Sequence, residues 1–338
     1  MTRIGFDEMK ETIRLAFVKA GMDNKKAGIC AEVHTESSRD GVYSHGLNRV
    51  ERFIEYIEKG WVDVNAEPSV QLSMGNFEVW NGNLGPGVLN AIFAMDRAME
   101  IASVHGLGWV SMNNTTHWMR GGSYGWQAIG KGFMAICWTN TESCMPPWGA
   151  KSQAIGNNPL VMAIPHENGP LLLDMAMSQY SYGKLQVQRL KNEKLPFPGG
   201  FSREGQLTDE PGLIEESRRI LPTGYWKGSG LAIMLDLFAA ITSGGLTAPG
   251  MDKLGKGFCG GCSQVFIAFD PLRFNTKDYV EQTINDTVNQ VKNADRAVDN
   301  EEIFYPGELS LRRREENLRL GIPVDDEIWE RVKRLAEL

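Results

Sequence analysis

The sequence predicts an α+β fold with two domains, one of which is assembled from both ends of the chain. A chain of 338 residues is too long for one hydrophobic core of ordinary size, so we expect two cores. The predicted elements come in the order helices, mixed strands and helices, then helices again. We therefore expect a mixed-sheet α/β domain at residues 76–274 and a discontinuous helical domain formed by residues 1–75 and 275–338.

Three helices are predicted in the first segment. Apolar residues recur at helical spacing from Met9 to Ala20, and Gly21 ends this first helix. Asp23 is placed to cap the start of a second helix. A third apolar stripe runs from Leu47 to Ile57, so Arg49 is expected to project from the first turn of the third helix.

The middle of the chain alternates strands with helices, and polar or glycine-rich turns separate them. We expect strands at residues 70–72, 77–80, 108–112, 133–138, 159–164, 171–175 and 264–269, and helices at 88–104 and 231–241. Residues 185–223 are rich in proline, glycine and charge, which predicts a long excursion outside the core. The remainder is predicted to be helical, with a break at Tyr305-Pro-Gly307.

Composition limits the class of partner. A hydrophobic content of 42% and a charged content of 23% are those of a soluble globular protein. The net charge of −7 disfavours nucleic acid and anionic membranes, since both need a cationic face. The apolar run Leu231–Ala240 is too short to span a membrane, and the N-terminus has no signal-peptide pattern. Five cysteines, mostly far apart, predict a reducing cytoplasmic location.

The stretch Gly41–Arg49 carries the strongest local signal for chemistry. Ser44 stands next to His45, and Arg49 follows four residues later. A hydroxyl and an imidazole can orient and donate a proton, and a guanidinium can clamp a carboxylate with two hydrogen bonds. On spacing alone, the alternative is a turn between two helices whose polar residues face water.

Other polar residues follow predicted strands, in loops of the kind where ligand-binding groups gather. His117 comes after a strand and two threonines, and its alternative is a buried histidine bonded to those threonines. Asp174 either caps the next turn or contacts a sugar hydroxyl, and Asn140 is assigned to the substrate. The remaining histidines, interpreted as structural or exposed, are His34, His105 and His166.

No glycine fingerprint of the form G-x-G-x-x-G follows a strand, so spacing alone does not predict a nicotinamide site. Lys227-Gly-Ser-Gly230 is the best local candidate for an anion, and the alternative there is a glycine-rich helix entrance. No histidine pair has metal-ligand spacing, and Cys259-Gly-Gly-Cys262 lacks the further ligands of a zinc site. We expect no metal.

Four runs of the sequence resemble the malate/L-lactate dehydrogenase family, whose nucleotide-binding fold is not of the Rossmann type. They are Gly41-Val-Tyr-Ser-His-Gly46, Thr116-His-Trp-Met-Arg-Gly-Gly-Ser-Tyr-Gly-Trp126, Met145-Pro-Pro-Trp-Gly-Ala-Lys151 and Gly224-Tyr-Trp-Lys-Gly-Ser-Gly230. The likeness covers essentially the whole chain. The first run is shared across the family, and the second and third are more specific to the branch that acts on 2,3-diketo-L-gulonate.

The resemblance implies a cytoplasmic homodimer that reduces a small 2-oxo acid with NADH. His45 is then the proton donor, and Ser44 is its orienting neighbour. Arg49 binds the substrate carboxylate, and His117 is a second active-site histidine that competes with His45 for the role of proton donor. The residues that the resemblance assigns to the cofactor are Pro170, Leu171, Leu172, Leu173, Asp174, Met175, Ala176, Trp226, Lys227, Gly307, Glu308 and Leu309.

The resulting hypothesis is reduction of 2,3-diketo-L-gulonate to 3-keto-L-gulonate with NADH, and NADPH is the alternative cofactor. Malate, L-lactate, ureidoglycolate and cyclic-imine chemistry stay open, because the shared motif does not name the substrate. Outside the family's chemistry, the alternative is a non-catalytic protein that binds a sugar acid. Such a binder has no need of a proton donor.

Overall fold

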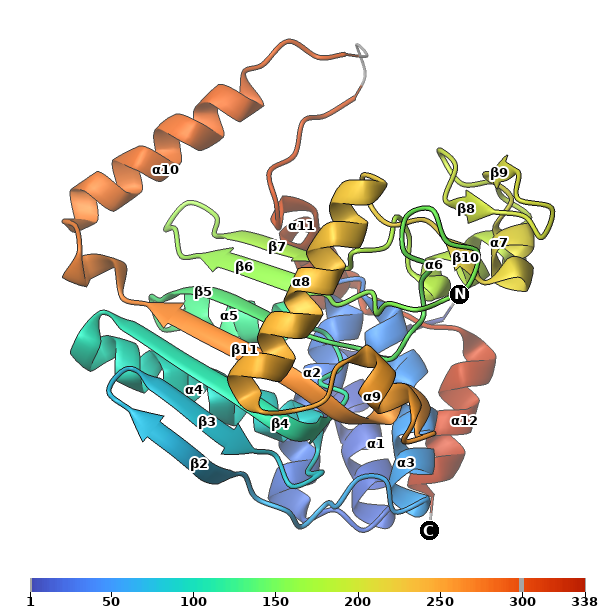
Figure 1. Cartoon of the computed structure of the whole chain (residues 1–338), viewed down its shortest axis with the longest axis horizontal. Coiled ribbons are helices and arrows are strands. Elements are labelled where there is room, and N and C mark those ends of the chain that lie inside the picture. The colour runs from blue at the N-terminus through green and yellow to red at the C-terminus, as the bar shows by residue number, and fades with distance from the viewer. Residues whose placement is uncertain (1, 298–300, 338) are drawn as a thin grey trace.

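The chain is built around a mixed β-sheet, which Figure 1 shows running through the middle of the molecule. The structure is a computed structural model that describes residues 2–297 and 301–337. Within these residues the sheet has seven strands, of which β3 and β4 run parallel and the other neighbours antiparallel. In sheet order they are β2 (Ser69–Met74), β3 (Phe77–Asn81), β4 (Leu107–Thr116), β11 (Gly260–Phe269), β5 (Met134–Thr139), β6 (Leu160–Ile164) and β7 (Leu171–Met175). The predicted α+β class is confirmed.

Helices cover both faces of this sheet. On one face lie α4 (Gly87–His105) and α5 (Gly122–Gly130), and α4 presents a row of buried alanines to the strands. This close packing requires a glycine in β4, because a Cβ at Gly108 would collide with the carbonyl oxygen of Ala98. The other face is covered by α8 (Trp226–Ser243), which crosses β11 in Figure 1 and leads into the short α9 (Ala248–Asp252).

The two ends of the chain pack together in a separate hydrophobic cluster. Here β1 (Arg3–Ile4) pairs with β12 (Ile322–Pro323), and α12 (Asp326–Ala336) packs on α1 (Phe6–Lys19). The helices α2 (Asn24–Arg39) and α3 (Val50–Glu58) complete the cluster. The domain boundaries at residues 75 and 275 stay a prediction.

Another C-terminal helix lies away from this cluster. In Figure 1, α10 (Lys277–Lys292) stands at the rim of the molecule, beside the turn that joins β6 to β7. His166 of that turn contacts Glu281 and Asn285 of α10, at 3.2 Å in each case. The chain then returns through α11 (Glu308–Leu320) to the sheet edge at β7.

Three local predictions were wrong in detail. Residues 113–116 continue β4 instead of leaving it, because β11 pairs with them through two register shifts. The third helix begins at Val50, after two 3₁₀ turns at Tyr43–His45 and Leu47–Arg49. Further 3₁₀ turns lie at Gly257–Cys259 and Pro271–Arg273. The glycines after Lys227 lie inside the first turns of α8, which starts at Trp226.

The predicted excursion at residues 185–223 is not wholly outside the core. It forms α6 (Tyr182–Leu190), α7 (Pro211–Ser217) and a small antiparallel sheet. The sheet contains β10 (Arg219–Ile220), β8 (Gly200–Phe201) and β9 (Leu207–Thr208). Leu185, Ile214 and Ile220 are buried and pack with residues of α8 and β11. The prolines and glycines correctly predicted turns, but the buried apolar side chains between them were not recognised in the sequence.

Candidate functional site

The sheet directs several polar residues to one edge. Its strands β3, β4, β5 and β7 all run in the same direction, so their carboxyl ends meet there. His117 follows β4, Asn140 follows β5 and Asp174 stands at the penultimate position of β7. The carboxyl ends of strands therefore bring together residues that are far apart in the sequence.

The loop of Ser44 and His45 is fixed against α2. The N–H of Leu47 donates to Ser38 Oγ at 2.8 Å, and a Cβ at Gly46 would collide with Ser38 and with the carbonyl oxygen of His34. Only glycine allows the loop to approach the helix this closely. From the other side, α6 approaches Ser44, since a Cβ at Gly183 would lie 3.0 Å from Ser44 Cβ.

His45 and His117 lie side by side. Their rings are stacked, with centroids 5.8 Å apart and planes inclined by 19°. The Ser44 hydroxyl lies 3.0 Å from His45 Nδ1. His117 Nδ1 accepts a 2.9 Å hydrogen bond from the backbone N–H of Met119, so the proton of the neutral His117 ring is on Nε2. Both imidazoles thus have one nitrogen engaged by a near neighbour in sequence.

Burial and nearby cations keep both imidazoles neutral. Burial, and after it the positive charges of Arg49 and Arg120, lower the pKa of His45 to about 3. Burial is also the main cause that holds the pKa of His117 well below its usual value, with Arg49 next. Binding of an anion beside Arg49 would cancel part of this effect and raise both pKa values.

Arg49 is placed to receive such an anion. It is partly buried, and burial lowers its own pKa. In residues 2–297 and 301–337, its side chain has no hydrogen-bond or carboxylate partner. A partly buried guanidinium without a counter-ion favours binding of a carboxylate ligand.

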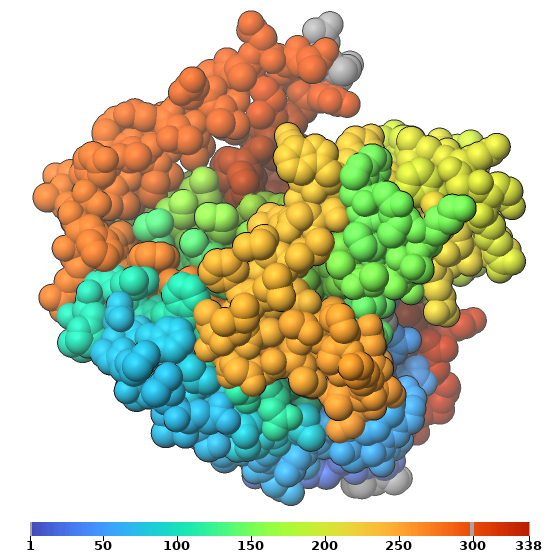
Figure 2. Space-filling model, in the orientation of Figure 1, coloured from blue at the N-terminus to red at the C-terminus, as the bar shows by residue number. Residues whose placement is uncertain are grey.

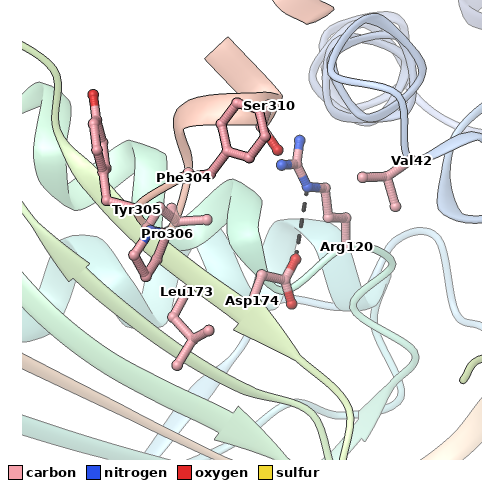
Figure 3. A pocket seen from close by; sticks show the side chains of 10 residues that line it. Val42, Arg120, Leu173, Asp174, Phe304, Tyr305, Pro306 and Ser310 are labelled. Atoms are coloured by element: carbon pink, nitrogen blue, oxygen red, sulfur yellow. Dashed lines mark ion pairs between the residues drawn. The ribbon is translucent and has the colours of Figure 1, made fainter. Parts of the chain in front are cut away.

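A cavity of about 370 Å³ is lined by parts of the two predicted cofactor segments and by Val42 and Arg120, which are close in sequence to His45 and His117 (Figure 3). Leu172, Leu173 and Asp174 form one wall, and Gly307 belongs to the other. The Leu172 N–H donates to the carbonyl oxygen of Pro306 at 2.9 Å, which joins the two walls. Gly307 has a φ of +97°, and a Cβ there would lie 2.9 Å from the Leu172 nitrogen. The exposed backbone at this junction fits a flat ligand such as part of a nicotinamide dinucleotide.

Asp174 is held by the start of α5. Its Oδ2 accepts a 2.9 Å hydrogen bond from the Gly122 N–H and lies 3.7 Å from Arg120 Nε. Burial raises the pKa of Asp174, and Arg120 and the Gly122 N–H oppose this effect. The predicted alternative was a cap on the turn after the strand, but the backbone N–H that Asp174 accepts from belongs to Gly122 of α5; the carboxylate also faces the cavity (Figure 3).

Asn140, which was also predicted to bind the substrate, belongs to a buried hydrogen-bond network. Asn140 is fully buried and donates to Asp236 and to the Leu246 carbonyl, while its own oxygen accepts from the Ser263 N–H. A substrate contact to Asn140 would therefore use the second lone pair of its oxygen.

The other cofactor candidates do not all reach the cavity. Trp226 and Lys227 are exposed at the start of α8. Shortly before this helix, the Thr223 N–H donates to the carbonyl of Met177, which follows the end of β7. Glu308 is buried between Lys292 and Arg312, and Leu309 is 45% exposed. Around β7, the members that lie outside the cavity lining are Pro170, Leu171, Met175 and Ala176.

Sequence reasoning missed three charged residues beside the site. Arg120, Asp40 and Arg314 form one hydrogen-bonded cluster. Arg120 had a weak local signal, three residues after His117, but Arg314 is 274 residues from Asp40 and had none.

Within the described residues, neither a metal-ligand cluster nor a membrane-spanning helix is present. No group of three or more histidine, cysteine or acidic side chains there is arranged to hold a metal ion. Cys259 and Cys262 are both buried free thiols. None of the helices in the described part of the chain is both long and apolar enough to cross a membrane.

Comparisons with known proteins agree over nearly the full length. The model of the family described as malate/L-lactate dehydrogenase matches residues 4–333. The 2,3-diketo-L-gulonate reductase of Escherichia coli O1:K1 is 44% identical over 342 residues, which cover 98% of this chain and 100% of that protein. The protein of the same name from Klebsiella pneumoniae shows the same identity and coverage.

Solved structures share the fold. Malate dehydrogenase from Pyrococcus horikoshii OT3 has a TM-score of 0.90 at 25% identity, over 99% of this chain and 94% of that chain. Sulfolactate dehydrogenase from Methanocaldococcus jannaschii has a TM-score of 0.88 at 26% identity, over 99% of this chain and 96% of that chain.

Proposed function

Because this chain belongs to the malate/L-lactate dehydrogenase family, as its motifs predicted, we propose that it reduces 2,3-diketo-L-gulonate to 3-keto-L-gulonate with NADH. The family makes the chain an oxidoreductase that acts on hydroxy and oxo acids. The choice of substrate rests on the relatives named 2,3-diketo-L-gulonate reductase, which align with the chain from end to end.

One observation carries the chemistry of this proposal. His45 stacks on His117, bonds Ser44 and lies within the electrostatic reach of the unpaired Arg49. A site for reducing a 2-oxo acid needs a proton donor for the new hydroxyl and a cation for the carboxylate. This cluster offers both groups beside a cavity of suitable chemistry.

In the proposed reaction, Arg49 holds the substrate carboxylate through paired hydrogen bonds. A bound dihydronicotinamide supplies the hydride to the carbonyl carbon. His45 gives a proton to the carbonyl oxygen, and because Ser44 engages Nδ1, this proton leaves from Nε2. The imidazole must first become protonated, and the substrate carboxylate on Arg49 favours this by raising the low pKa of His45. His117 is the alternative donor, since it lies in the same stack.

The cofactor would be held by residues of the two cavity walls. Leu172, Leu173 and Gly307 offer backbone and apolar surface, and Asp174 can accept hydrogen bonds from ribose hydroxyls. The other predicted contacts, Trp226 and Lys227, would lie beyond the end of β7. NADPH is the alternative to NADH.

The protein would act as a cytoplasmic homodimer. Support comes from α8, whose outer face is apolar and uncovered at the front of the molecule in Figure 2. Exposed apolar surfaces of this kind mark protein interfaces. The exposed residues on this face include Trp226, Met234, Leu237, Phe238 and Ile241.

The proposed function is tested with a panel of 2-oxo acids and the loss of NADH or NADPH absorbance. We expect the highest kcat/KM for 2,3-diketo-L-gulonate with NADH. A higher value for pyruvate, oxaloacetate or a cyclic imine would transfer the assignment to that substrate. Binding of NADH without turnover of any acid would favour the non-catalytic binder, and absence of NADH binding would reject the oxidoreductase itself.

A further inference from the structure

A buried cluster of charges includes Arg120, which lines the cofactor cavity and lowers the pKa of His45. Asp40 is 1% exposed, and its two oxygens accept four hydrogen bonds, from Arg39, Arg120 and Arg314. Burial of Asp40 opposes its ionisation, but the three arginines bring its pKa down to about 2. The carboxylate is therefore ionised, and its hydrogen-bonding capacity is divided among three guanidinium groups.

Arg120 is the member of this cluster that is left with unused donors. It is 3% exposed and makes one hydrogen bond, from Nη1 to Asp40 at 2.7 Å, although a guanidinium has five N–H groups. Its Nε has no hydrogen-bond partner among the described residues, because the nearest oxygen of Asp174 is 3.7 Å away. A buried cation with unsatisfied donors is costly unless a ligand completes its coordination.

The side chain of Arg120 faces the cavity between the cofactor segments. Figure 3 shows its guanidinium above Asp174 and near Ser310 of α11. The start of α11 adds Gly307 and Ser310 to the lining of the cavity. Asp174 provides an acceptor for hydroxyl groups beside the N–H groups of Arg120, which can donate to an anion. This combination matches a ribose joined to a phosphate better than it matches a lone carboxylate.

We infer that Arg120 binds the diphosphate of the nicotinamide dinucleotide. This inference rests on the proposed function and deepens it, because none of the predicted cofactor residues is a buried cation. Arg120 donates from its free N–H groups to phosphate oxygens while Asp40 holds it in place. Asp174 accepts from the hydroxyl groups of the adjacent ribose.

The variant Arg120→Gln tests this role with limited risk to the fold. When Arg120 is replaced, Asp40 keeps Arg39 and Arg314 as partners, and Asp174 keeps the Gly122 N–H. Arg120→Lys keeps the charge but loses the planar fork. Arg313→Gln is the matched control, because Arg313 is an exposed arginine of α11 outside the cavity lining.

Affinities are measured by calorimetry for three ligands: NADH, ADP-ribose and dihydronicotinamide riboside. The first two carry the diphosphate and the third has no phosphate. We expect Arg120→Gln to weaken NADH and ADP-ribose by about 10- to 100-fold, as for loss of hydrogen bonds to a charged group, and to leave the riboside within about twofold. Arg120→Lys should fall in between, and Arg313→Gln should match the wild type.

The outcomes separate this inference from the proposed function. If the wild type binds none of the three ligands, the proposed function fails. If the wild type binds NADH and Arg120→Gln binds it equally well, Arg120 is not a phosphate ligand. Equal weakening of all three ligands would overturn the inference in favour of a structural role. A rise in KM for the 2-oxo acid alone, with unchanged NADH affinity, would assign Arg120 to the substrate carboxylate instead.

Discussion

Protonation of the buried His34 should lower the free energy of unfolding at acidic pH, whereas the exposed His105 should have no such effect. His34 is fully buried in α2, where its ring lies 5.2 Å from that of Phe17 and 5.9 Å from that of Phe53. Its Nδ1 lies 2.7 Å from the Cys30 carbonyl, so Nδ1 carries the proton, and Nε2 has no partner among the described residues. We predict that His34→Phe removes a group whose protonation opposes folding.

The size of the effect follows from the pKa. Burial lowers the pKa of His34 from 6.5 to about 4, against a smaller opposing effect of the Cys30 carbonyl. Between these two pH values the unfolded chain binds a proton on His34 and the folded chain does not, so the free energy of unfolding falls as the pH falls. At about 1.4 kcal/mol for each pH unit, the loss amounts to about 3 kcal/mol at pH 4.

Urea unfolding, followed by tryptophan fluorescence at pH 7, 5.5 and 4, measures this loss. We expect the free energy of unfolding of His34→Phe, relative to the wild type, to rise by about 3 kcal/mol between pH 7 and pH 4. The phenyl ring can join the aromatic contacts of Phe17 and Phe53. His105→Gln, at an exposed residue, is the control and should give a curve parallel to the wild type. A parallel curve for His34→Phe as well would refute the reasoning.

Three further predictions concern the site and the interface. His45→Asn should lower kcat at least about 100-fold while NADH still binds. A near-normal kcat would assign the role of proton donor to His117 instead. Arg49→Lys should raise KM for the 2-oxo acid about tenfold with a smaller change in kcat, because lysine cannot form paired hydrogen bonds. If steady-state kinetics found an unchanged KM, Arg49 would not be a substrate ligand. Ile241→Glu replaces a side chain that is 76% exposed on α8 with a charged one; we expect sedimentation velocity to find a dimer for the wild type and a monomer for this variant. A dimer that persists in Ile241→Glu would place the interface elsewhere.

Much of the fold could be predicted because its signals are local. The apolar runs that became β5, β6 and β7 were found within one residue of their observed ends. Asp23 caps α2 as predicted, with its carboxylate accepting from the N–H groups of Lys25 and Lys26. Such features depend on residues a few positions apart, which a single sequence displays directly.

The errors came from tertiary contacts. Thr115 and Thr116 look like loop residues, yet they continue β4 because β11 pairs with them, and residues at and before the start of α4 bond their hydroxyl groups. Asn90 donates to Thr115 Oγ1, and Thr116 Oγ1 donates to the Gly85 carbonyl and accepts from the Gly87 N–H. No pattern within the strand itself could have indicated these partners.

In the candidate site, too, local features could be predicted and tertiary contacts could not. Ser44, His45 and Arg49 could be picked from one short stretch, because their chemistry is visible in their order. The stacking of His45 on His117 joins residues 72 positions apart and depends on the end of β4 meeting the loop after α2. Distances of this kind require the fold.

The cluster around Asp40 has a consequence for how the protein is made. Hydrogen bonds from Arg314 close a loop of 274 residues onto Asp40. During synthesis from the N-terminus, the buried carboxylate therefore lacks one of its three cations until almost the whole chain has left the ribosome. A nascent chain that ends before Gly307 also lacks that wall of the cofactor cavity. Ligand binding and completion of the polypeptide should thus coincide, so that a truncated chain cannot be rescued by its cofactor.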